Sequence, residues 1–158
     1  MGREIEKKFL IADDSWRGLA EGTPYRQGYL ASGNGATVRV RTIENKGILT
    51  VKGPDEGGVK LEYEYEIPFK DALEMLGRLC RGPLIEKVRY RIPYAGFTWE
   101  VDEFSGENAG LLLAEIELDF LGQEFVKPPW IGREVTGDPR YYNASLVHSP
   151  YSLWRDKP

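Results

Sequence analysis

The sequence predicts a mainly antiparallel β domain of the α+β class, with eight strands and a few helices packed outside them. Three observations lead to this prediction. Ionic and apolar residues alternate through most of the short segments, which is the period of a β-strand with two unlike faces. Clusters of glycine, proline and asparagine separate these segments, as expected for turns between antiparallel strands. Only one longer segment follows helical spacing. Eight antiparallel strands can close into a barrel, although the alternation alone also permits an open sheet.

The strands follow from the alternation and the turn signals. The run Asp13-Asp14-Ser15 offers an N-cap to a short helix over residues 16–21, which Gly22 ends and Thr23-Pro24 is expected to break. The run Ser32-Gly33-Asn34-Gly35 is typical of a hairpin turn. The eight predicted strands cover residues 3–10, 25–30, 36–42, 48–52, 59–67, 84–92, 97–104 and 111–120.

The longest predicted helix covers residues 70–80. Its apolar residues recur at helical spacing, Pro68 ends the strand before it, and Gly82-Pro83 ends the helix itself. The tail beyond residue 120 contains Pro128-Pro129 and a stretch rich in Tyr, Asn and Ser. This composition indicates loops and a short helix that cover the domain.

Length and composition narrow the class of protein. The 158 residues suit a single domain spanning 1–158, and 41% hydrophobic residues can bury a sizeable core. A net charge of −4 argues against nucleic-acid binding. No signal peptide or membrane span is expected, because no apolar run approaches the necessary ~18 residues. The lone Cys80 excludes an internal disulfide and suits the cytoplasm. The lone His148 excludes a multi-histidine metal site, so a metal would need oxygen ligands.

Seven of the eight predicted strands carry ionic residues on one face. Arginine and lysine are the donors that a polyanion needs, and paired carboxylates are the ligands of hard divalent cations. The basic positions are Lys8, Arg39, Arg41, Lys52, Lys87 and Arg89, and the acidic positions are Glu4, Glu6, Glu62, Glu64, Glu100, Asp102, Glu115 and Glu117.

A sheet with one ionic face and one apolar face can take two arrangements. It can lie open with its charged face in water, which is common on edge strands, or it can close with the charged face inward. The mixture of signs favours an enclosed site for a metal-bound polyphosphate. Metal cations would neutralise the acids there, and the basic side chains would hold the phosphate oxygens.

The opening motif Glu4-x-Glu6-x-Lys8 resembles the ExExK signature of the CYTH superfamily, also called triphosphate tunnel metalloenzymes. The resemblance covers nearly the whole chain, and the tail over residues 134–143 is similar to that of small bacterial single-domain members. Residue 60 is lysine where relatives often have arginine, which keeps the charge but removes the bidentate fork. Six further motifs follow in the family's order: Arg39-Val40-Arg41, Thr50-Val51-Lys52-Gly53, Glu62-x-Glu64, Lys87-x-Arg89, Val101-Asp102-x-Phe104 and Ala114-Glu115-Ile116-Glu117-Leu118.

The resemblance implies a closed eight-stranded antiparallel tunnel that binds a triphosphate compound with Mg²⁺ or Mn²⁺. It implies that Glu62 and Glu64 hold a metal or orient the attacking water, with Asp102 nearby, and that Lys8 also takes part in catalysis. The carboxylates implied to hold the other metal are Glu4, Glu6, Glu115 and Glu117. The side chains implied to bind phosphate are Lys8, Arg39, Arg41, Lys52, Lys87 and Arg89.

Three functions fit these residues. The first is a metal-dependent hydrolase of inorganic triphosphate, and thiamine or nucleoside triphosphates are alternative substrates of such an enzyme. The second is an adenylate cyclase of the same fold. The third is a polyphosphate- or nucleotide-binding module without catalysis. The sequence shows no adenine-reading motif, and inorganic triphosphate requires none, which favours the first. The sequence leaves open whether the chain forms a homodimer.

Overall fold

The computed structural model of the protein describes residues 2–32 and 35–156. The predicted hairpin turn at residues 32–35 includes Gly33 and Asn34, which lie outside the described residues. The described strands are β1 (Arg3–Glu4), β2 (Glu6–Ile11), β3 (Gly22–Ala31), β4 (Thr37–Ile43), β5 (Lys46–Lys52), β6 (Lys60–Ile67), β7 (Ile85–Tyr94), β8 (Phe97–Phe104), β9 (Leu112–Glu117) and β10 (Ile131–Glu134). The α-helices are α1 (Phe69–Arg78) and α2 (Asn143–His148), and single 3₁₀ turns cover Asp14–Trp16, Gly106–Asn108, Pro139–Tyr141 and Tyr151–Leu153.

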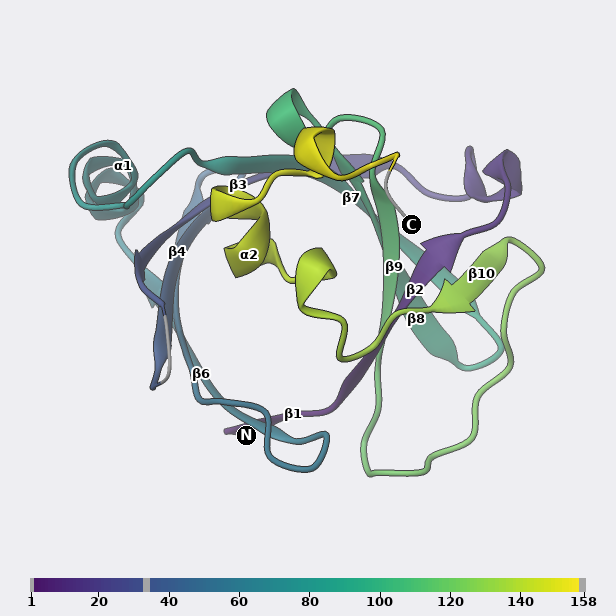
Figure 1. The fold of residues 1–158 in the computed structure, drawn as a ribbon. Coiled ribbons are helices and arrows are strands. Elements are labelled where there is room, and N and C mark those ends of the chain that lie inside the picture. The colour runs from purple at the N-terminus through teal and green to yellow at the C-terminus, as the bar shows by residue number, and fades with distance from the viewer. Residues whose placement is uncertain (1, 33–34, 157–158) are drawn as a thin grey trace.

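The strands form one antiparallel sheet in the order β1-β6-β5-β4-β3-β7-β8-β9-β2-β10, which curls around a central space (Figure 1). The first predicted strand is two strands. β1 pairs with β6 at one edge of the sheet, β2 pairs with β9 near the other, and only Ile5 separates them. The N-terminal segment therefore joins the two edges, although the ladder of hydrogen bonds is interrupted there. The mainly antiparallel tunnel fold is confirmed in this form.

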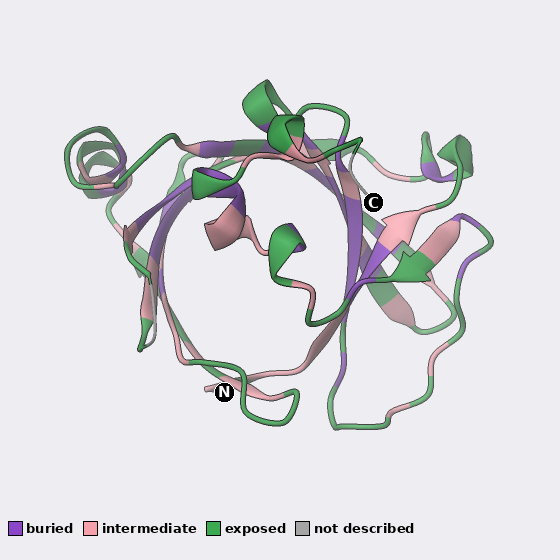
Figure 2. Ribbon diagram, in the orientation of Figure 1, coloured by how far each residue is buried: buried purple, intermediate pink, exposed green. Residues whose placement is uncertain are grey.

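The outer face of the sheet carries the apolar half of the alternation. Phe9, Trp99 and Trp130 belong to one buried cluster beneath the chain that follows β9. Tyr141 and Leu146 belong to a second cluster, which anchors α2 and the 3₁₀ turn before it. Figure 2 shows the buried residues gathered along the strands and on α2, whereas the connecting loops are largely exposed. The second cluster also contains Tyr29 and Leu113, which lie on the inward face of the sheet, so it fills the end of the tunnel beneath α2. Apolar packing therefore covers the outside of the sheet and one end of the interior, and the charged residues line the rest of the interior.

Two local predictions were wrong. The helix expected over residues 16–21 is a single 3₁₀ turn at Asp14–Trp16, capped as predicted by the side chain of Asp13. The strand predicted to begin at Tyr25 begins at Gly22, so Pro24 lies inside β3. Pairing of β3 with β4 begins only at Tyr25, so Pro24 has a strand neighbour on one side alone, where proline is tolerated.

The tail, predicted as loops and a short helix, also contains one strand, β10. β10 adds to the outer edge of β2, and the predicted short helix is α2, which lies across one end of the tunnel (Figure 1). None of the described helices is long and apolar enough to span a membrane.

The helix α1 packs on β4 and β5 through a close approach at Gly47. A Cβ atom built at Gly47 would lie 2.6 Å from Cβ of Ala72, which is fully buried. We expect Gly47→Ala to destabilise the fold by about 1–3 kcal/mol, because the added methyl group forces α1 away from the sheet. Urea unfolding measures this loss.

Gly77 provides the control on the same helix. No atom lies within 4 Å of a Cβ built at Gly77, so alanine fits there without strain. Gly77→Ala should stabilise the protein by about 0.5–1 kcal/mol through helix propensity. Equal effects of the two substitutions would contradict the packing described for Gly47.

Candidate active site

The tunnel encloses a cavity of about 680 Å³. Strand alternation directs the charged side chains into it, and the antiparallel registers set them face to face. Lys8 lies opposite Glu115, Glu6 lies opposite Glu117, and Lys52 lies opposite Glu62. Of the predicted site residues, those that line the cavity are Glu4, Glu6, Lys8, Arg39, Arg41, Lys52, Glu62, Glu64, Lys87, Arg89, Glu115 and Glu117.

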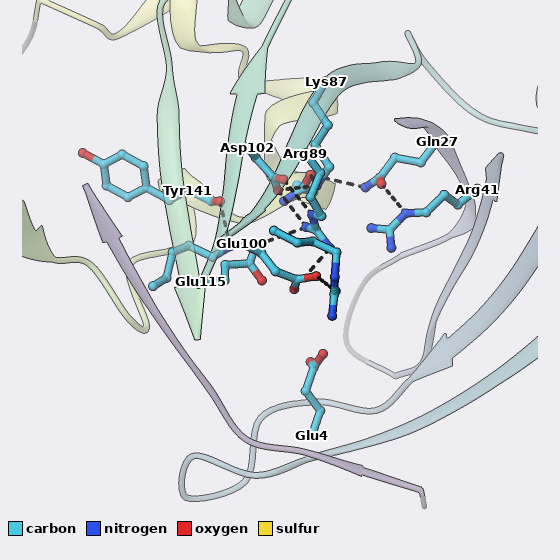
Figure 3. Close-up of polar contacts among 12 residues, drawn as sticks. Glu4, Gln27, Arg41, Lys87, Arg89, Glu100, Asp102, Glu115 and Tyr141 are labelled. Carbon is cyan, nitrogen blue, oxygen red and sulfur yellow. Dashed lines mark hydrogen bonds and ion pairs between the residues drawn. The ribbon is translucent and has the colours of Figure 1, made fainter. Parts of the chain in front are cut away.

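Asp102 is the one predicted site residue that does not line the cavity. Its carboxylate lies on the same inward face of the sheet as its strand partner Arg89, is almost wholly buried, and accepts from Lys87 Nζ at 2.7 Å and from Arg89 Nε and Nη2 at 2.7 and 2.8 Å (Figure 3). Burial would raise the pKa of Asp102, but Arg89 and Lys87 hold it below its usual value. Asp102 therefore stays ionised and fixes two cations that face the cavity.

Lys87 is itself almost wholly enclosed, with 1% of its side chain exposed. Burial lowers its pKa to about 7, and the neighbouring Arg89 and Arg41 act in the same direction against the attraction of Asp102. A nearby anion would raise the pKa of this lysine, because negative charge favours the protonated form.

Arg41 has a different environment. In the described part of the chain, no carboxylate lies within ion-pair distance of its guanidinium, and its Nε donates to Oε1 of Gln27 at 2.8 Å. Burial lowers the pKa of Arg41 to about 9, with the charges of Arg39 and Arg89 adding to the effect. Nε of Arg39 is buried without a hydrogen-bond partner among the described residues, although its Nη2 lies 3.5 Å from the carboxylate of Glu64. At Arg41, the cationic part of the cavity therefore carries positive charge that no described carboxylate pairs.

The acidic part shows the opposite imbalance. Lys52 Nζ bridges Glu4 at 2.9 Å and Glu62 at 3.3 Å. Burial raises the pKa of Glu4, and the nearby Glu62 raises it further. Burial together with Glu115 raises the pKa of Glu6 well above its usual value. Raised values of this kind indicate carboxylates that lack enough nearby positive charge.

The donor set fits a hard divalent cation. The acidic ligands offer oxygen alone, and Mg²⁺ commonly binds one or two carboxylates together with substrate phosphate oxygens and water. Among residues 2–32 and 35–156, no group of three or more acidic, histidine or cysteine side chains is arranged as a ready-made metal site. The residues therefore fit a metal that arrives with a phosphate ligand better than one held by the protein alone.

Several lining residues were missed by the sequence reasoning. Tyr25 and Tyr29 line the cavity from β3, the one predicted strand without an ionic face, and the fully buried Gln27 lies between them on the same face of the strand. Their alternate spacing indicated a shared strand face, but the search for site residues followed ionic side chains and therefore passed over uncharged ones. Asn143 was missed because its partners lie far away in the sequence, and the exposed His148, expected on the surface, also lines the cavity.

A curled antiparallel sheet with an unbalanced cationic wall and facing glutamates defines a tunnel protein that binds a polyanion. The chain belongs to the CYTH domain family, whose model matches residues 2–149.

Two curated relatives support this membership over nearly the whole length. An inorganic triphosphatase from Acetivibrio thermocellus is 56% identical over 156 residues, which is 99% of this chain and 100% of that protein. An inorganic triphosphatase from Nitrosomonas europaea is 38% identical over 152 residues, covering 92% of this chain and 97% of that protein. The crystal structure of the inorganic triphosphatase NE1496 matches with a TM-score of 0.65 and 36% identity, covering 91% of this chain and 93% of that one.

Asp102 provides a test of the buried charge arrangement. We expect Asp102→Asn to cost about 3–5 kcal/mol, because the amide leaves Lys87 and Arg89 as uncompensated buried cations. The loss should be larger at pH 6 than at pH 9. The pKa of Lys87 is about 7 in the wild type and falls further without the carboxylate, so at pH 9 Lys87 is neutral in both folded proteins and only Arg89 loses its charged partner. At pH 6 the wild type also has a protonated Lys87 beside Asp102, and the variant loses that pair as well. Urea unfolding at both pH values measures the difference.

The adjacent Glu103 serves as the control for Asp102. It pairs with Arg17 on the outside of the sheet, and both side chains are more than one-third exposed. Glu103→Gln should therefore change stability little at either pH. A loss for Asp102→Asn no larger than that of the control would contradict the role given to the buried carboxylate.

Proposed function

We propose that the protein is a divalent-metal-dependent triphosphatase that hydrolyses inorganic triphosphate to diphosphate and phosphate. One observation carries the proposal: a buried cationic wall, with Arg41 unpaired by any described carboxylate, faces glutamates whose pKa values are raised. A polyphosphate satisfies the first group and a metal cation satisfies the second. The two relatives named inorganic triphosphatases, matched over nearly their full length, support the same substrate.

The substrate would be held along the cationic wall. Arg39, Arg41 and Arg89 present guanidinium groups suited to phosphate oxygens, and Lys87 adds a buried ammonium. Lys8 and Lys52 would hold the phosphates nearest the glutamates, since each already lies within 4.0 Å of a carboxylate. Binding an anion among these cations relieves their mutual repulsion, which is a driving force that bulk water cannot supply.

The glutamates would hold the metal. Glu4 and Glu62 both lie close to the ammonium group of Lys52. Glu6 lies close to Glu115, the strand partner of Lys8. We assign Glu117 to the same set, because it lines the cavity and the nearby Glu4 contributes to its raised pKa. When bound, Mg²⁺ or Mn²⁺ would neutralise charge on the phosphates and favour ionisation of the attacking water.

Glu64 is our candidate for orienting that water. Its carboxylate accepts from Thr50 Oγ1 at 3.2 Å, and Thr50 also accepts from Arg39. This contact fixes one side of the carboxylate, while 47% of the side chain remains accessible to water. Water held there would attack the terminal phosphorus, and the bond to the bridging oxygen would break to release diphosphate. Asp102 would act through Lys87 and Arg89 rather than by touching the metal.

We place the enzyme in the cytoplasm, because small triphosphate compounds are intracellular substrates and the single Cys80 is free. More than half of the residues that line the cavity are charged, although Tyr25, Ile43 and Ile48 also contribute apolar surface. The charged majority favours a wholly ionic substrate over a nucleotide or thiamine ester.

The deciding experiment incubates the protein with inorganic triphosphate, ATP or thiamine triphosphate in the presence of Mg²⁺ or Mn²⁺. We expect diphosphate and phosphate from inorganic triphosphate at the highest kcat/KM, and no activity in excess EDTA. Products are identified by ion chromatography. Turnover in excess chelator would contradict the metal requirement, and cyclic AMP formation from ATP would favour the cyclase alternative.

Arg41 and Arg26 form a matched pair for testing the cationic wall. Arg41 points into the cavity, whereas Arg26 pairs with Glu86 outside it and is half exposed. We expect Arg41→Ala to lower kcat/KM for triphosphate about 10–100-fold, since a hydrogen bond to a charged group is worth about 1.5–3 kcal/mol. Arg26→Ala should match the wild type. If both variants keep wild-type kinetics, Arg41 does not bind the substrate.

A further inference from the structure

Two amide side chains connect the cationic wall to the helix at the end of the tunnel. Asn143 begins α2, and its Oδ1 accepts from Lys87 Nζ at 3.0 Å and from Gln27 Nε2 at 3.3 Å. The other end of the Gln27 amide accepts from Arg41 Nε at 2.8 Å. Gln27 has no exposed surface. The four side chains therefore form one buried chain of hydrogen bonds, in the order Lys87, Asn143, Gln27 and Arg41.

The partners fix the orientation of both amides. Lysine and arginine donate hydrogen bonds and accept none, so each must meet an amide oxygen. With Asn143 Oδ1 toward Lys87, the same oxygen can also accept from Nε2 of Gln27. Turning either amide around would set two donors against each other. The arrangement is therefore specific to amides at both positions.

The absence of charge on these two residues is the informative property. A carboxylate at either position would pair with Lys87 or Arg41 and satisfy its charge inside the protein. An amide oxygen fixes the direction of the cation with a hydrogen bond but leaves the net positive charge for an incoming anion. Lys8 is held partly in the same way, because its Nζ donates to the backbone carbonyl of Tyr141 at 3.1 Å, but it also lies 4.0 Å from the carboxylate of Glu115.

We propose that Gln27 and Asn143 are positioning residues, forming an uncharged bridge that holds Arg41 and Lys87 in place for triphosphate without neutralising them. This inference rests on the function proposed above. The bridge joins β3 to α2, so it also fixes the end of the tunnel to the wall that binds phosphate.

The test uses the full-length protein with Gln27→Met, Asn143→Ala and Asn143→Asp. Methionine keeps the volume of Gln27 but donates and accepts no strong hydrogen bond. We expect Gln27→Met and Asn143→Ala each to raise KM for inorganic triphosphate about tenfold, with a smaller change in kcat. The double variant should be little worse than the poorer single variant, because the two residues act as one unit.

Asn143→Asp separates positioning from mere packing. Aspartate has nearly the same shape, and its charge should pair with Lys87 and keep the melting temperature at or above that of the wild type. The same pairing should weaken triphosphate binding more than Asn143→Ala does. Calorimetry with inorganic triphosphate in excess chelator measures this affinity without requiring turnover.

Asn108 supplies the matched control. It is a buried asparagine whose Oδ1 accepts from the backbone of Tyr151 at 2.8 Å, so it also anchors the C-terminal segment, but it does not line the cavity. Asn108→Ala should lower the melting temperature and leave KM and affinity unchanged.

The outcomes separate the two proposals. If KM and affinity of both Asn143 variants stay within twofold of the wild type, the bridge is structural and the inference is wrong, whether or not Gln27→Met folds. If the wild type binds inorganic triphosphate but does not hydrolyse it, the proposed function fails. The calorimetric comparison of the variants still decides the role of the bridge in that case.

Discussion

The buried carboxylate of Asp102 is the interaction on which the cationic half of the tunnel depends. A lysine and an arginine cannot be enclosed together without a counter-charge, because removing either ion from water is costly. Asp102 supplies that charge as the strand partner of Arg89, with hydrogen bonds of 2.7–2.8 Å to Lys87 and Arg89. Lys87 and Arg89 still line the cavity. Asp102 therefore allows the two cations to be enclosed next to Arg41, whose charge no described carboxylate pairs, and this wall can hold a polyphosphate.

The N-terminal segment has two roles in the fold. The first segment must close the tunnel and also deliver acids to its interior. Pairing β1 with β6 and β2 with β9 achieves both, because alternate residues of a segment that spans the two edges point inward. Glu4, Glu6 and Lys8 therefore line the cavity at the seam. The closing segment and the start of the acidic wall are the same eight or nine residues, so closure and ligand binding are coupled.

Much of the fold and most of the candidate site could be predicted, because strand alternation fixes which residues share a face. Arg39 and Arg41 needed no tertiary information to be placed together. The predictions that were wrong concern features that depend on which strands pair with each other. Pro24 is tolerated because β3 has a strand neighbour on one side alone there, and the burial of Asp102 away from the cavity depends on Lys87 and Arg89, which β7 sets against it. Gln27 and Asn143 are 116 residues apart and uncharged, so no sequence pattern links them.

The partners of the tunnel cations differ according to where the charge is needed. Arg89 lies near carboxylates on two strands, with Asp102 at 2.7 Å and Glu100 at 3.4 Å on β8 and Glu115 at 3.9 Å on β9, so much of its charge is balanced. Among the described residues, Arg41 contacts the amide of Gln27 and the ring of Tyr25, with its guanidinium 5.0 Å from the ring centroid, and no carboxylate. Both environments orient a guanidinium, but only the second leaves its charge uncompensated. The strongest attraction for a phosphate group should therefore lie at Arg41, and the balanced Arg89 beside it should chiefly direct the anion along the wall toward the glutamates.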